Sequence, residues 1–504
     1  MLRPRAPSGA VADLAAGITW GGPILTPVVA LVMPPIILGL SDSKTALVQA
    51  IARASRNGVP LLLKPGKHFT QPGRQQKILI GSNGLRLSVA PPPFPVLPKP
   101  PAVIKRPDNA INLHAPDENF GLFFIPSTPT VSEVAGITWK SHHHSDGRLF
   151  EFGIVIRGNI EIDGVMVDCN MGRQGLSALP NKSDAEHSAM LGFAGHEYSK
   201  MLGPAGLEQD IPRGPANIPR VVYVGFRSVV LRNMVTANGG FADDVWISRG
   251  YFNPNIERVV IEKFSSLNRV SPKRATITFS GVCQTIEIKD VDIYKLEMED
   301  DTKQHFNQLP RQSDQFTPSK WELMGIKAER IGLAAKGKVY VLKATDLTAR
   351  KSFTLYQAGG SIMNSTLAAG DGFRLFRLND FVFDGVTWQF KPDKTGTVHG
   401  LRPTSQNGDP CNVTFRGNVF KVAGHPTSGQ IINSKYSGEE EDNRVTVSLT
   451  GCTYPEPFGR SVDMPIAKVK ERGHWTFIRA DLGTREPDVG IQEGPQSDID
   501  LHII

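Results

Sequence analysis

Three aspartates in the first half of the chain have the chemistry of an acid–base site. Asp168 ends a short apolar run, and Asp243 and Asp244 form an adjacent pair. Two carboxylates that flank a glycosidic bond suffice for hydrolysis, one as acid and the other as base or nucleophile. The same oxygens could hold Ca²⁺, which would neutralise a uronate for β-elimination. The plainer interpretation is that all three are solvated turn residues.

Basic side chains near these aspartates extend the predicted catalytic set. A lyase base must take a proton alpha to a carboxylate, which suits a desolvated Arg249 or Lys263. His196 titrates near neutral pH and is a further candidate acid or base. For each residue taken alone, an ordinary surface group is the competing interpretation.

The predicted substrate-binding residues are Asn238, Trp246, Tyr198 and Glu197. Trp246 and Tyr198 could stack on sugar rings, whereas aromatic packing under a loop is the default alternative. Asn238 and Asn268 are predicted to occupy equivalent positions just after two successive strands. Asparagines in such positions also stack for purely structural reasons.

Three consecutive histidines, His142 to His144, suggest a metal site at first sight. Neighbouring residues on an extended chain point in opposite directions, so three in a row rarely bind one ion. We therefore predict an exposed cluster, no metal site, and no cofactor other than Ca²⁺ if the protein is a lyase.

The elements that must position these residues come from a recurring strand pattern. Two or three alternating apolar residues precede a Gly, Asn, Asp or charged residue, and two more apolar residues follow. Most copies lie about 30 residues apart, so we expect two coils between Ile288 and Val341, and two coils plus an insertion between Ile162 and Leu231. The residues in register are Ile162, Leu231, Ile261, Ile288, Val341, Phe383, Phe415, Val447 and Phe477.

A right-handed parallel β-helix, an all-β solenoid, explains this spacing best. Each coil would place its strand over the previous one, with apolar side chains stacked inside. The Gly, Asn or Asp in each copy suits a corner where φ is positive. A β-sandwich needs turns every 8–12 residues and a propeller about 40–45 residues per blade, so neither fits as well.

The four-residue sequence Gly-Ile-Thr-Trp hints that the repeat extends upstream. Gly136–Trp139 can be overlaid on Gly164–Val167, and Gly17–Trp20 repeats it. Gly385–Val386–Thr387–Trp388 has the same form inside a later copy of the pattern.

An amphipathic helix is predicted over residues 41–58, with Ser41 or Asp42 as its N-cap and Gly58 just past its end. A buried strand, residues 59–63, and a Pro-Gly turn, Pro65–Gly66, follow. This unit resembles the N-terminal cap of the pectate-lyase-like β-helix superfamily. The resemblance is confined to this short unit, from Ser41 to Phe69, and implies a fold, with no particular activity.

The catalytic motifs of that superfamily are not matched. The β-helix polygalacturonases carry N-T-D, an Asp pair, G-H-G and R-I-K in order, and only Asp243–Asp244 echoes the pair. The calcium-binding aspartate string of the pectate lyases is also missing. No catalytic residue is therefore carried over from the resemblance.

We expect an N-terminal segment, residues 1–40, one β-helix domain, residues 41–490, and a C-terminal tail, residues 491–504. Two insertions, about 171–220 and 299–321, would wall a groove, since long loops in compact folds are often functional. The proline-rich residues 91–101 cannot form a central strand, so they are predicted to be a surface loop or linker.

The amino-acid composition limits the classes of binding partner that we expect. The net charge of +7 allows affinity for an acidic glycan, but no basic run interleaved with aromatics indicates nucleic acid. Prolines interrupt the apolar residues 18–40, which argues against a membrane helix and leaves no clean signal peptide. An extracytoplasmic location therefore stays an open expectation.

Four cysteines, Cys169, Cys283, Cys411 and Cys452, have no CxxC spacing. We expect buried free thiols, with a disulfide between neighbouring coils as the alternative.

The function that these features predict is cleavage of a polysaccharide or oligosaccharide, neutral or acidic, by hydrolysis or β-elimination. This rests on analogy between folds. The alternatives are a non-catalytic, glycan-binding β-helix of the tailspike or adhesion type, or a glycan epimerase or transferase. We expect a monomer or a homotrimer, and the homotrimer would be typical of a tailspike-like protein.

Overall fold

The structure, a computed structural model, describes residues 14–15, 30–33, 43–69, 76–90, 102–105, 122–143, 147–168, 189–237, 243–248, 256–267, 276–280, 285–299, 320–334, 340–356, 358–368, 374–376, 378–405, 410–433, 444–469, 473–480, 482, 490–492 and 497–503. Strands make up nearly all of the secondary structure in these residues, which confirms the all-β class. Most of the strands pair in parallel. Two compact units, residues 1–274 and 275–504, are described separately below.

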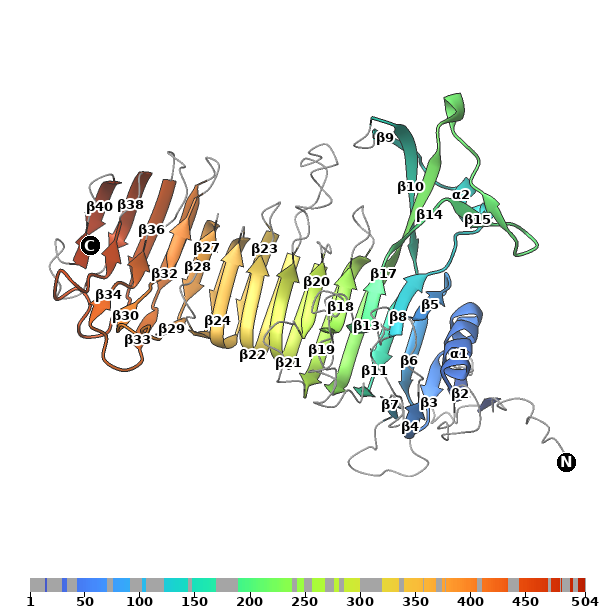
Figure 1. Cartoon of the computed structure of the whole chain (residues 1–504), viewed down its shortest axis with the longest axis horizontal. Coiled ribbons are helices and arrows are strands. Elements are labelled where there is room, and N and C mark those ends of the chain that lie inside the picture. Colours follow the sequence, from blue (N-terminus) through green and yellow to red (C-terminus); the bar gives the residue numbers. More distant parts are fainter. Residues whose placement is uncertain are drawn as a thin grey trace, which may run out of the picture. The chain divides into compact units, whose positions relative to one another are not determined.

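The first unit is built on three parallel ladders of strands (Figure 1). In the first ladder the residues at one central position face each other from strand to strand, and all but Leu31 are almost completely buried. They are Leu31 in β2 (Ala30–Met33), Leu61 in β3 (Leu61–Leu63), Leu87 in β6 (Leu85–Val89), Ile162 in β11 (Ile160–Asp163), Leu231 in β17 (Arg220–Ala237) and Ile261 in β19 (Ile256–Ser266).

The other two ladders of this unit repeat the arrangement. The second contains β4 (Gly66–Phe69), β7 (Ala102–Lys105), β12 (Val165–Asp168) and the C-terminal halves of β17 and β19. The third contains β5 (Gln76–Ile80), β8 (Leu122–Pro126), β13 (Ala189–Ala194) and β18 (Asp243–Ser248). Phe124 and Phe193 stack in its core, with ring centroids 5.1 Å apart.

A left-handed backbone marks the corner between the first two ladders. Gly164, Asn233 and Lys263 occupy the same place in successive strands, with φ between +51° and +72°. In the second unit φ lies between +48° and +64° at Asp290, Gly325, Asp346, Asn364, Gly385, Gly417 and Gly451. The predicted corner with positive φ is therefore confirmed.

The register of the first unit corrects one interval. Ile162 lies directly opposite Leu231, so the chain between them forms one repeat with a long excursion, and the prediction of two coils is wrong. Pairing also extends upstream to Leu87, which was not predicted, and to Leu61, which lies in the predicted buried strand over residues 59–63.

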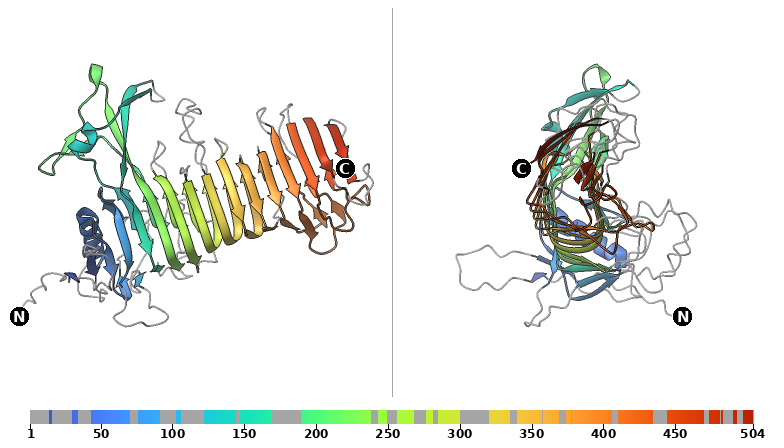
Figure 2. Two further views of the ribbon diagram at one scale, coloured as in Figure 1. Left: turned by 180° about the vertical axis from the view of Figure 1, so that it is seen from behind. Right: turned by 90° about the vertical axis from the view of Figure 1, so that its left-hand side faces the viewer.

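In the second unit the equivalent buried positions are Ile288, Leu323, Ala344, Ile362, Phe383, Phe415 and Leu449. The strands that carry them are β21 (Thr285–Glu299), β22 (Lys320–Ala334), β23 (Tyr340–Thr345), β25 (Ala358–Met363), β28 (Asn379–Asp384), β32 (Cys411–Arg416) and β36 (Arg444–Thr450). A row of these strands is visible in Figure 2. Two further strands follow, β38 (Gly473–Ala480) and β40 (Ser497–Ile503), and β40 lies within the residues assigned to a tail.

Three predicted register positions of this unit are wrong. Ala344 rather than Val341 lies in the buried row, because Val341 is three residues too early. Val447 is opposite Val413, two residues before Phe415, and Phe477 is opposite Val447, so it is displaced in the same way. The successive repeats from Leu323 to Ala344, Ile362 and Phe383 are much shorter than the expected period, so a search at that period could not find them.

The predicted N-terminal helix is present as α1 (Ser43–Asn57). It lies beside the first strands of the first unit, at the N-terminal end of the row of strands, in both views (Figures 1 and 2). Leu47, Ile51 and Ala54 are completely buried on the face that the amphipathic pattern predicts. Gly58 follows with φ +66°, and β3 begins soon after.

A projection rises from the first unit (Figure 1). It contains α2 (Val131–Ala135), β9 (Lys140–His143), β10 (Leu149–Arg157), β14 (His196–Tyr198), β15 (Lys200–Leu202), β16 (Glu208–Asp210) and the start of β17. The predicted repeat at Gly136–Trp139 is wrong, because Gly136 caps α2 and the next three residues form no strand. Gly385–Trp388 does fit, with Trp388 buried, whereas Gly17–Trp20 lies outside the described residues.

The predicted insertions are smaller than expected. Within residues 171–220, β13 is a strand of the third ladder, and only the part from 195 onward joins the projection. Of residues 299–321, Trp321 is a buried core residue opposite Ile286. Residues 300–319, 169–188 and 91–101 lie outside the described residues.

Two of the four cysteines fall within the described residues, and both are free thiols. Cys411 is buried, and burial raises the pKa of its thiol to about 11, while Cys452 is half-buried. In the part of the chain that the structure covers, no helix has the length and apolar character needed to cross a membrane.

Gly417 tests the corner by itself, because a Cβ there would meet no atom within 4 Å. We expect Gly417→Ala to lower the free energy of unfolding by about 1–2 kcal/mol, the cost of a left-handed L-residue. Gly417→Asn should cost less, since Asn tolerates this conformation. Denaturant titration of the three proteins measures the difference, and equal stability of all three would contradict a strained corner.

His68 makes the stability of the first unit depend on pH. Its side chain is completely buried, and burial lowers its pKa below the ordinary value of 6.5. A ring N–H can donate to the Lys64 carbonyl at 2.9 Å, while Nδ1 has no partner among the described residues. Stability is therefore full above about pH 6.5 and falls as the pH drops towards the lowered value.

We expect His68→Gln, which keeps a donor for the Lys64 carbonyl, to flatten this dependence. Melting temperatures between about pH 7.5 and pH 5 should fall less steeply in the variant. Parallel curves for variant and parent would show that His68 does not titrate in this range.

Candidate functional site

The second ladder of the first unit ends in polar residues. The last residues of β7, β12 and β17 are Lys105, Asp168 and Ala237. In the ladder Asp168 lies opposite Lys105 on one side and opposite Ala237 on the other. One residue earlier, Thr236 of β17 lies opposite Ser266 of β19. Because parallel strands end at the same edge, this edge collects side chains from four strands.

Asp168 pairs with a lysine at this edge. Its Oδ2 lies 4.0 Å from Lys105 Nζ, and each side chain is only about one-seventh exposed, 13% and 14%. Sequence reasoning missed Lys105, although β7 ends in a charged residue after an apolar run, as β12 does. The pair places an anion and a cation side by side on neighbouring strands.

Asp244 is held from inside the same edge. The hydroxyls of Thr236 and Ser266 both donate to its Oδ2, at 2.6 and 2.5 Å, and the carboxylate is 2% exposed. Two hydroxyl donors on one oxygen stabilise the charged carboxylate where water cannot reach it. Asp243 precedes it on β18, opposite Ala189, and is 9% exposed.

The structure therefore brings Asp168, Asp243 and Asp244 to one edge of the first unit. Asp168 lies opposite Ala237, the residue after Thr236, and Thr236 is bonded to Asp244. The prediction that these three aspartates share an edge agrees with this arrangement. Burial of Asp243 and Asp244 argues against the alternative of solvated turn residues.

His196 does not join this group. Asp243 lies opposite Ala189, at the start of β13, whereas His196 follows the end of that strand. About 17 Å of strand therefore separates them. Burial and, secondarily, Lys77 lower the pKa of His196, whose ring lies edge-on to Tyr198 with centroids 4.8 Å apart.

Tyr198 and Glu197 belong to the projection. The Tyr198 hydroxyl donates to the Pro126 carbonyl at 2.5 Å, and burial raises its pKa to about 12. The ring packs on a small core of Val134, Met201, Ile211, Val222 and Val224. Glu197 is exposed opposite Tyr223. Neither side chain reaches the aspartates.

Trp246 lies on the outer face of β18. Its ring is tilted against Phe123, with centroids 5.5 Å apart, and it packs on Ile125 and Ala194. Gly192 lies between the two rings in the ladder, and a Cβ there would come within 2.0 Å of the Phe123 ring. Trp246 is half-buried, so part of the ring remains accessible.

Lys263 is exposed at the left-handed corner, three residues before Ser266. It therefore lies along the strand from the edge rather than at it. Arg249 and Asn238 lie outside the described residues, as do Asn268 and Cys169.

The prediction that the three histidines form an exposed cluster is wrong for His142. His142 is buried against Phe150 and Phe152, while His143 is exposed on the other side of β9. His144 lies outside the described residues. Within the described ranges, no three His, Cys, Asp or Glu side chains are grouped to hold a metal ion.

The aspartate edge does not fit Ca²⁺ either. Asp244 directs one oxygen at two hydroxyl donors, and Asp168 already faces an ammonium group. A calcium site needs several oxygens that are free to converge on one cation.

The hydrogen bond between Thr236 and Asp244 should be measurable as stability. Thr236→Val removes the donor and keeps the shape, so we expect a loss of about 1.5–3 kcal/mol, as for bonds to charged groups. Thr236→Ser, which keeps the hydroxyl, is the matched control. Equal denaturation midpoints for the valine and serine variants would show that the bond contributes nothing.

No family model matches this chain, and a search of curated proteins also finds no match. What the edge does must therefore be inferred from its geometry and chemistry.

Proposed function

We propose that this chain is a right-handed parallel β-helix that binds and cleaves a glycan at the aspartate edge. Three parallel ladders and their shared left-handed corner support the solenoid. Right-handedness is expected because crossovers between parallel strands in one sheet almost always have that hand. The convergence of Asp168, Asp243 and Asp244 on one edge carries the functional part.

Asp168 and Asp243 are the acid–base pair in this proposal. Asp168 lies 4.0 Å from the Lys105 ammonium and is the proposed base that activates water, or the nucleophile that attacks the anomeric carbon. Asp243, 9% exposed and adjacent to Asp244, is the proposed acid that donates a proton to the leaving oxygen. Asp244, bonded to Thr236 and Ser266, positions its neighbour rather than touching the glycan.

Trp246 is the proposed binding residue outside this edge. Its half-buried ring, supported by Phe123, offers a flat apolar face to a sugar. Packing on Phe123 accounts for the partial burial of this ring without a ligand. We therefore assign Trp246 a role in glycan binding and none in the cleavage step.

Non-catalytic glycan binding is the second candidate function. The observation that favours it is the buried Asp244, since a carboxylate bonded to two internal hydroxyls can serve the fold alone. A homotrimer by light scattering would support this version, and a monomer would count against its tailspike form.

A panel of neutral and acidic polysaccharides separates the candidates. New reducing ends indicate hydrolysis, and ultraviolet absorbance of an unsaturated product indicates elimination. We expect Asp168→Asn and Asp243→Asn each to lower turnover by about 10²–10⁴-fold, the usual contribution of acid–base groups.

The matched control is Asp163→Asn, on the preceding strand of the same repeat and away from the edge. It should turn over substrate as the parent does. Full activity in both edge variants would rule out the proposed site, and binding without any product would favour the second candidate.

A further inference from the structure

The projection of the first unit contains a strand with one open edge. β10 pairs with β17 over residues 151–157 and, on its other edge, with β9 over residues 149–152 only. In the described part of the chain no strand pairs with residues 153–157 on that second edge. Backbone N–H and C=O groups of an extended strand need partners, so this edge can accept another strand.

The chain leaves this edge for a physical reason. Before β9 it crosses the face of the sheet, where Ile137 packs over Gly153, and a Cβ on Gly153 would lie 2.1 Å from the Ile137 side chain. Trp139 lies further along, with the Arg220 guanidinium 4.5 Å from its ring centroid. The crossing segment is therefore held against the face and cannot also cover the edge.

On the other side of this edge, α2 is held in place by Arg157 of β10. Arg157 bonds to Glu133 of α2 and donates to the carbonyls of Ser127 and Thr128, both at 3.0 Å. Glu133 also caps its own helix by accepting from Thr130. The carboxylate of Glu133 is thus engaged within the protein.

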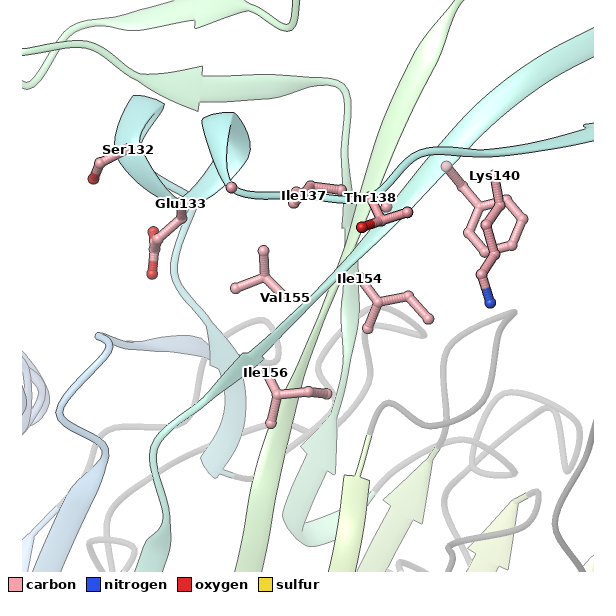
Figure 3. Close-up of a pocket in the computed structure, with 11 residues that line it drawn as sticks. Ser132, Glu133, Ile137, Thr138, Lys140, Ile154, Val155 and Ile156 are labelled. Atoms are coloured by element: carbon pink, nitrogen blue, oxygen red, sulfur yellow. The ribbon is translucent and has the colours of Figure 1, made fainter.

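A cleft of about 610 Å³ lies between these elements (Figure 3). Phe152, Ile154 and Ile156 from one face of β10 line it together with Gly153 and Val155 from the other face. Residues of both faces line this cleft, as expected for a cleft that runs along the edge of the strand. Across from them lie residues of α2 and of the segment that leads into β9, among them Ser132, Thr138 and Lys140.

We propose that this cleft binds an extended peptide segment of a partner protein as an added β-strand along residues 153–157. The backbone edge favours an extended chain, and the isoleucine and valine side chains favour apolar residues at alternate positions. Lys140 is exposed where β9 begins and has no ion-pair partner among the described residues, so it selects an acidic residue at that end. This docking does not depend on glycan cleavage.

The test uses the full chain and a labelled synthetic peptide of about seven residues that alternates valine and threonine and ends in glutamate. Fluorescence anisotropy should show saturable binding. Two further peptides carry N-methyl groups on alternate peptide bonds, one set in each register. Only one set points its N–H groups at β10, so we expect one methylated peptide to bind at least tenfold more weakly and the other to bind nearly as well.

Charge reversal tests the register of the peptide. Lys140→Glu should weaken binding of the glutamate peptide by about two- to fivefold, as for an exposed ion pair, and a peptide ending in lysine should recover the loss. Lys200→Glu, on the projection but outside the cleft, is the matched control and should have no effect.

Three results would overturn the proposal. They are equal binding of both methylated peptides, no saturable binding at millimolar peptide, and a concentration-dependent dimer in sedimentation that Ile154→Glu abolishes. The last would assign the edge to a second copy of the chain. The methylated peptides keep the test decisive even if a variant fails to fold.

Discussion

Backbone hydrogen bonds between parallel strands hold each repeat on the next, and they determine which distant side chains become neighbours. Ile162 faces Leu231 across a long excursion of the chain, and Leu231 faces Ile261 across a much shorter one, with the same ladder geometry. The length of the intervening loop does not change the geometry of this pairing, because the ladder depends only on the position of each strand. The corner with positive φ keeps this register, since it turns every strand at the same point.

The same constraint explains why polar groups are buried at the aspartate edge. Thr236 and Ser266 occupy inward positions that elsewhere hold apolar residues, and a buried hydroxyl needs an acceptor. Asp244 supplies one oxygen to both. The arrangement costs desolvation of a carboxylate, and such costs are commonly retained at functional sites rather than in a plain core.

Much of the fold could be predicted because the signal is local. The alternation around Ile162, Leu231, Ile261 and Ile288 is complete within a single short strand pattern, and the corner residue lies inside it. The failures come from features that a fixed period cannot see. Ala344 is too small to stand out beside Val341, and the short repeats around Ile362 fall below the expected spacing.

The site was harder to predict than the fold. The edge that Asp168 shares with Asp244 follows from strand register, but the long distance of His196 from it depends on where β13 begins, which its sequence does not reveal. Lys105 was missed because its strand is short and follows a proline-rich stretch. The helix α2 was not predicted, although its sequence carries a local signal: Thr130 and Glu133 have the spacing of a capping box.

The unequal repeat lengths have a consequence for how the chain folds. Closing a loop costs entropy that grows with its length, so joining Ile162 to Leu87 costs about 1.2 kcal/mol more than joining Ile362 to Ala344, whose loop is roughly four times shorter. Strand pairing should therefore begin among the short repeats between Leu323 and Phe383, where contacts are most local. Those repeats would serve as the template on which their longer neighbours assemble.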